Sequence, residues 1–130
     1  MVDKINLEKS DIDKAKDLLH ALDNSMLKPN SFFWFYISDS KVWRLVIASS
    51  IFNNKSTHEV YENFVNKFRN NNNVKEIGLE NITLLNSNND LIKILKSAIN
   101  TESKSVSEIR FKASTINNVY IDDAYIYRLS

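Results

Sequence analysis

The sequence contains no cysteine, one glycine and one proline among its 130 residues. Without cysteine the chain has no disulfide, no thiolate nucleophile and no cysteine-ligated metal, so a reducing, cytoplasmic location is the simplest expectation. A single glycine, Gly78, cannot build a phosphate-binding loop or a dinucleotide fingerprint, because both motifs need several glycines. These absences exclude the common nucleotide-binding motifs, and no cofactor is expected.

The charge is balanced and long apolar runs are missing. Seventeen basic residues face sixteen acidic ones, for a formal net charge of +1, which gives no overall attraction to nucleic acid or to an anionic membrane. The longest apolar run, residues 32–37, is far shorter than the roughly 20 residues that span a bilayer, so no membrane partner is expected. The length and the ordinary composition predict one globular domain over residues 1–130.

The chain is organised around two aromatic and β-branched runs at residues 32–37 and 42–48. Such residues favour strands, and the short polar interval between the runs predicts an antiparallel hairpin. Both tryptophans, Trp34 and Trp43, lie in it, so it supplies much of the apolar area of the core. We expect this hairpin in the middle of the sheet.

Three helices are predicted from capping residues followed by apolar residues at helical spacing. The first covers about residues 10–23, the second opens at residues 56–59 and the third follows the capping segment 87–90. Between the second and third, the asparagines at 70–73 predict a solvated loop. Residues 74–79 are expected to be irregular or a short strand, and residues 82–85 form a short strand.

The end of the chain predicts a second hairpin. Asn117 and Asn118 tolerate positive φ and lie between two alternating runs, as a two-residue turn requires. In this pairing, the sequence numbers of two facing residues add up to 235. The polar face pairs Lys112 with Asp123, Arg110 with Tyr125 and Glu108 with Tyr127; the apolar face pairs Ile109 with Ile126, Phe111 with Ala124 and Ala113 with Asp122. We expect helices to cover the apolar face and solvent to cover the other.

The order of elements is therefore αββαβαββ. Hairpins at both ends with helical connections around a short middle strand predict an α+β fold. Its core is a single mixed, mainly antiparallel sheet of about five strands with three helices packed on it.

Two segments, residues 43–49 and 116–129, resemble a family of small uncharacterised bacterial α+β proteins of unknown function, and the resemblance covers about residues 30–130. It implies a bacterial cytoplasmic setting and no particular activity. One departure is in the last turn, where Asn-Gly is expected and the chain has Asn117 and Asn118, which adopt positive φ at some cost.

Residues that could carry catalysis are few. His20 and His58 have no carboxylate pair at ligand spacing, so a histidine metal site is the minor interpretation against ordinary helix-surface histidines. Glu108 and Asp123 could hold a divalent cation for phosphodiester cleavage, but a cross-strand ion pair explains them more simply. No serine lies in a glycine-flanked elbow, so the balance favours a non-enzymatic protein without catalytic or metal-binding residues.

Binding is the favoured class of function. The candidate binding residues are Trp43, Arg110, Lys112, Asp123, Tyr125 and Tyr127. The leading hypothesis is a cytoplasmic protein-interaction or self-associating module, with exposed aromatic area as the partner or oligomer interface. The alternative is single-stranded nucleic-acid binding, with bases stacked on the tyrosines and phosphates neutralised by the basic residues. A lesser alternative is a metal-dependent phosphodiesterase or nuclease.

Overall fold

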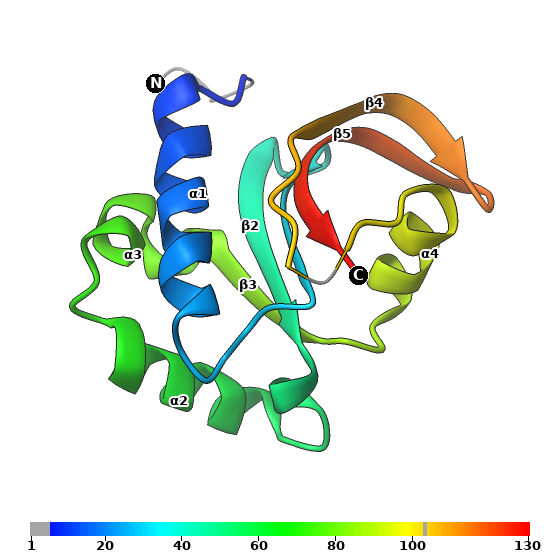
Figure 1. The fold of residues 1–130 in the computed structure, drawn as a ribbon. Helices are drawn as coiled ribbons and strands as arrows, with labels where there is room; N and C mark the ends of the chain where they lie inside the picture. The colour runs from blue at the N-terminus through cyan, green and yellow to red at the C-terminus, as the bar shows by residue number, and fades with distance from the viewer. Residues whose placement is uncertain (1–5, 103) are drawn as a thin grey trace.

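The computed structural model describes residues 6–102 and 104–130 and confirms the α+β fold with one mixed five-stranded sheet (Figure 1). The strand order is β3-β2-β1-β5-β4, and all neighbours are antiparallel except β2 and β3. The strands are β1 (Ser31–Ile37), β2 (Val42–Ser49), β3 (Ile82–Asn86), β4 (Ile109–Ile116) and β5 (Val119–Leu129). The helices are α1 (Lys9–Asp23), α2 (Thr57–Phe68), α3 (Asn72–Ile77) and α4 (Asp90–Ala98), with 3-10 turns η1 (Ser50–Phe52) and η2 (Leu79–Asn81).

Helices cover both faces of the sheet. In Figure 1, α1, α2 and α3 lie on one side and α4 lies on the other. The side chains of β1 alternate between the two cores: Phe32 joins the core under α1 to α3, and Phe33 joins the core under α4. Burial on both faces explains why the sequence of β1 is almost continuously aromatic. The strand order confirms the predicted central place of the first hairpin.

The helix α3 was not predicted. The asparagine run was expected to be a loop, but Asn71 caps the helix: its side chain accepts from the amides of Asn73 and Val74 at 2.9 and 3.1 Å. Asparagine is among the best N-cap residues, so the run that suggested a loop starts a helix instead. Burial of Val74 and Ile77 holds this short helix against α1. Gly78 then ends it at a φ of 91°.

The register of the second hairpin is confirmed, with Ile109 opposite Ile126 and Lys112 opposite Asp123. Ala113 is missing from the ladder because its φ is 45°, and Glu108 lies before the first residue of β4. The expectation of a solvent-covered polar face is wrong for Tyr127. This residue is fully buried, and its hydroxyl donates to the backbone oxygen of Ile12 in α1 at 2.7 Å.

The turn of this hairpin yields a stability prediction. Asn117 and Asn118 have φ values of 48° and 67°, which are the values of a type I′ turn. Replacing Asn118 with glycine should raise the free energy of unfolding by about 0.5 kcal/mol, because glycine adopts positive φ without steric cost. Urea denaturation measures this. Asn54→Gly, at the other positive-φ asparagine with φ 65°, serves as a comparison, and a loss of stability at Asn118 would contradict the turn assignment.

Candidate functional site

The predicted binding residues come together only in part. Arg110 of β4 donates two hydrogen bonds to the carboxylate of Asp123, both at 2.6 Å. Its guanidinium also lies 5.6 Å from the ring centroid of Trp43 on β2, in cation–π geometry. Tyr125 donates to Glu108 at 3.2 Å. The hydrogen bond to Asp123 raises the pKa of Arg110, and burial raises the pKa of Tyr125 with help from Glu108.

This cluster is closed rather than open. Trp43 is only 5% exposed and Tyr127 is buried, so neither ring offers a face on which a base could stack. Asp123 lies opposite Lys112 in the ladder, but its carboxylate bonds to Arg110 on the diagonal. Lys112 is exposed. The cluster therefore joins β2, β4 and β5 by internal contacts and leaves little for a nucleic acid to bind.

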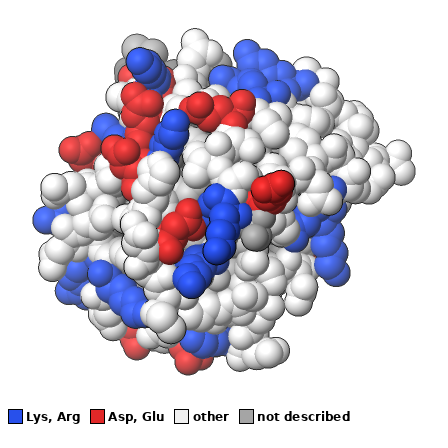
Figure 2. Space-filling view, viewed as in Figure 1, with Lys and Arg blue, Asp and Glu red and all other residues white. Residues whose placement is uncertain are grey.

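The distribution of surface charge also gives little support to nucleic-acid binding. Figure 2 shows acidic and basic side chains interleaved over the viewed face, with no large area of one sign. Binding to a nucleic acid backbone rests on neutralising several phosphates with clustered basic residues. This face offers no such cluster.

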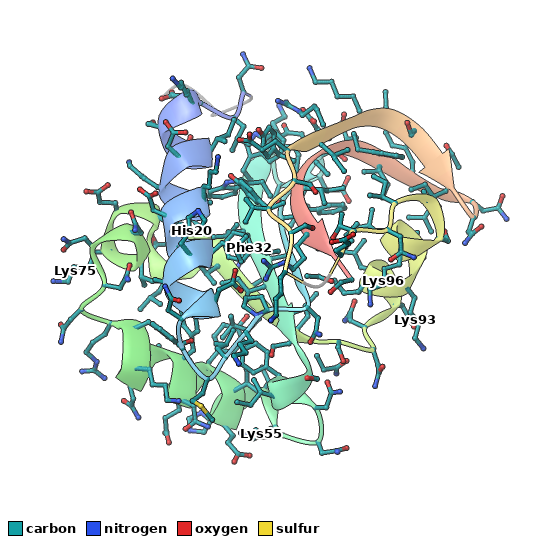
Figure 3. The ribbon with its side chains drawn as sticks, viewed as in Figure 1. His20, Phe32, Lys55, Lys75, Lys93 and Lys96 are labelled. Carbon is teal, nitrogen blue, oxygen red and sulfur yellow. The ribbon has the colours of Figure 1, made fainter. Side chains whose placement is uncertain are left out.

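The two carboxylates considered for metal chemistry already accept hydrogen bonds within the second hairpin. Glu108 accepts from Tyr125, and both oxygens of Asp123 accept from Arg110. The Nε2 atom of His58 lies 3.3 Å from the Oε2 atom of Glu62 on the exposed side of α2. His20 is exposed on α1 (Figure 3). Within residues 6–102 and 104–130, no group of three or more histidine, aspartate or glutamate residues could hold a metal ion.

A different feature, an apolar groove along α2, stands out. Its volume is about 260 Å³, just below the roughly 300–1,000 Å³ of pockets that hold drug-sized ligands. The walls are α2 and η1, and part of the lining comes from the loop between α1 and β1. The apolar lining residues are Leu27, Ile51, Phe52, Val60, Phe64 and Phe68. Ile51 and the half-buried Phe68 supply its accessible apolar area, since the other four side chains are only 2–7% exposed. The size suits one or two large apolar side chains of a partner better than a cofactor.

Local hydrogen bonds fix the walls of this α2 groove. The buried Ser49, at the end of β2, donates to the backbone oxygen of Leu27 at 2.8 Å and accepts from the amide of Ile51 at 3.3 Å. It therefore ties the α1–β1 loop to η1. Ser56 then starts α2 by accepting from the amide of Glu59 at 3.1 Å. Because each wall is anchored, the groove is built into the fold and needs no rearrangement to form.

Two exposed apolar side chains belong to segments that line the α2 groove. Ile51 in its wall is 37% exposed. Met26, next in the chain to Leu27, is 75% exposed, the highest value among the large hydrophobic residues that the structure describes. Methionine is flexible and polarisable and is common at protein-binding surfaces. The polar rim consists of Lys55, Asn63 and Lys67.

A smaller hollow of about 180 Å³ shares Phe52, Lys55 and Val60 with the α2 groove and extends toward Asn86 and Asn89. It lies where the parallel strands β2 and β3 end. The connection after β2 leads to the helices on one face and the connection after β3 leads to α4 on the other. Parallel strands whose connections diverge in this way leave a crevice at their carboxyl ends, which is a frequent binding position in α/β sheets.

Sequence reasoning missed this site. The apolar residues of α2 were all predicted to be buried, and no signal separated residues under the sheet from residues lining a groove. The residues predicted to be buried are Val60, Tyr61, Phe64, Val65 and Phe68. The one sign of this site in the sequence was a charged residue on the apolar face of the helix: Lys67 lies on the same helical face as Phe64 and Val60.

In comparisons with known proteins, no family model, no curated protein and no solved structure matches the chain. In the part of the chain that the structure describes, no helix has both the length and the apolar character needed to cross a bilayer.

Proposed function

We propose that this chain is a non-enzymatic protein-interaction module that binds a partner segment in the α2 groove. The observation that carries the proposal is the groove itself: an apolar, preformed hollow with Ile51 exposed in its wall and Met26 exposed in the loop that supplies Leu27. Exposed apolar area around a concave site favours a protein interface. The proposal includes a cytoplasmic setting, which suits a chain without cysteine. The resemblance to small uncharacterised bacterial proteins implies no activity and does not bear on the choice.

The internal contacts of the aromatic cluster support this choice over nucleic-acid binding. A base-stacking surface needs open rings, and Trp43 and Tyr127 are buried. The proposed binding surface is therefore formed by α2 and η1, in place of the surface of Trp43 and the second hairpin that the sequence predicted.

Selection of peptides from a random display library tests the proposal. Peptides that bind the wild-type protein should shift the amide resonances of Leu27, Phe52 and Phe64. Ile51→Asp should weaken their binding by about tenfold or more, because it places a charge in the apolar wall. The matched control is Val42→Asp, at an equally exposed valine (38% against 37%) at the other end of β2. The proposal fails if the peptides map elsewhere, or if both substitutions weaken binding alike.

A further inference from the structure

The charged side chains that line the α2 groove are all basic. Its lining includes Lys55 and Lys67 and no carboxylate. Neither carboxylate of α2 belongs to this lining: Glu62 lines a shallow hollow with His58, and Glu59, one turn before the rim residue Asn63, is exposed to solvent. An apolar hollow whose only charged lining residues are basic is complementary to an apolar side chain flanked by acidic ones.

The two lysines mark the ends of the groove. Lys55 precedes the first residue of α2 by two positions, and Lys67 is the penultimate residue of the helix. The ten helical steps from Thr57 to Lys67, at about 1.5 Å each, span roughly 15 Å along the axis. An extended chain covers this distance in about five residues at roughly 3.3 Å each. A carboxylate beside Lys55 would also face the amino end of α2, where the helix dipole favours negative charge.

We infer that the natural occupant of the α2 groove is an extended acidic segment of another protein, with one large apolar side chain between two carboxylates about five residues apart. This inference rests on the proposed function and adds the chemistry of the partner. The groove volume of about 260 Å³ accommodates the apolar side chain. Lys55 and Lys67 pair with the two carboxylates.

Charge also opposes a second copy of this chain joined groove to groove. Two copies joined through their grooves about a twofold axis would bring both pairs of Lys55 and Lys67 together, with no carboxylate in either groove lining. Like charges that face each other across an interface oppose association. We therefore expect light scattering to show a monomer at concentrations where the acidic segment binds.

Charge reversal at the rim tests the inference. The probe is a nine-residue peptide with phenylalanine between two glutamates five positions apart, and a second probe has lysines in place of the glutamates. The acidic probe should bind the wild-type protein about tenfold more tightly than the basic probe, as two partly exposed ion pairs permit. The double variant Lys55→Glu/Lys67→Glu should reverse this preference. Added salt should weaken the acidic complex.

The control carries the same change in charge at a distant place. Lys93→Glu/Lys96→Glu alters α4, which packs on the opposite face of the sheet from α2, well away from Lys55 in Figure 3. It should leave the preference for the acidic probe unchanged. If the display-selected peptides map to the groove but rim reversal changes neither probe, the inference is wrong and the proposed function stands. If the selected peptides do not map to the groove, the proposed function itself fails. A wild-type dimer that Ile51→Asp dissociates would overturn the inference in favour of a second copy.

Discussion

Replacing Asp23 with alanine is expected to lower the free energy of unfolding by about 3 kcal/mol, because it leaves a buried arginine without its counter-ion. Arg128 is 1% exposed and donates to the two carboxylate oxygens of Asp23 at 2.7 and 2.9 Å. It also donates to the backbone oxygens of Pro29 and Ser105 at 3.2 and 2.9 Å. Urea denaturation followed by tryptophan fluorescence measures the loss.

The same contacts connect stability to the α2 groove. Asp23 ends α1 and Pro29 precedes β1, so Arg128 holds both ends of the loop that carries Met26 and Leu27. Loss of Asp23 should therefore loosen one part of the groove lining and weaken the binding of groove-directed peptides, even at temperatures where the variant stays folded.

Two further variants distinguish the loss of a buried ion pair in Asp23→Ala from the removal of a surface charge. Glu76→Ala removes the partner of Lys14 in an exposed pair at 3.6 Å and should change stability by less than about 1 kcal/mol. Adding Arg128→Met to Asp23→Ala should recover part of the loss, because an apolar side chain then replaces the unpaired charge. Equal free energies of unfolding for Asp23→Ala and Glu76→Ala would show that the buried pair contributes no more to stability than the exposed pair.

Local patterns were sufficient to predict most of the elements and one register. The turn at Asn117 and Asn118 fixes which residues of β4 and β5 face one another, because a two-residue turn allows one alignment, and the structure has that alignment. The aromatic run of β1 similarly identified the central strand. These features depend on neighbours in sequence, which a single chain displays directly.

Features made by distant segments were not predictable in the same way. Alternation along β5 shows that Tyr125 and Tyr127 share a face, but it does not show that Tyr127 is fully buried while Tyr125 stays half-buried. The α2 groove draws its lining from three separate segments, so no periodicity in any one of them indicates a hollow. The helix α3 has six residues, and its stability comes from packing rather than from propensity.

Replacing Tyr127 with alanine should lower the free energy of unfolding by about 4 kcal/mol, because it leaves a cavity in the core beneath α1. The ring packs edge-on against Phe32 at 5.5 Å between centroids, and the hydroxyl holds α1 through Ile12. Tyr125→Ala, at the half-buried neighbour on the same face, should cost about 1 kcal/mol. Denaturant unfolding of the two variants distinguishes a core residue from a surface one.

Tyr127→Phe isolates the hydroxyl of this residue. Burial raises the pKa of Tyr127 far above its usual value, so the folded protein keeps a proton that the unfolded chain releases near pH 10. The stability that this proton provides is complete below pH 10 and is lost as the pH rises above it, since the unfolded state then binds fewer protons than the native state. The phenylalanine variant should therefore show a shallower alkaline loss of stability than the wild-type protein. A variant that keeps wild-type stability together with an unchanged alkaline profile would place Tyr127 outside the core and return it to the surface on which a ligand could bind.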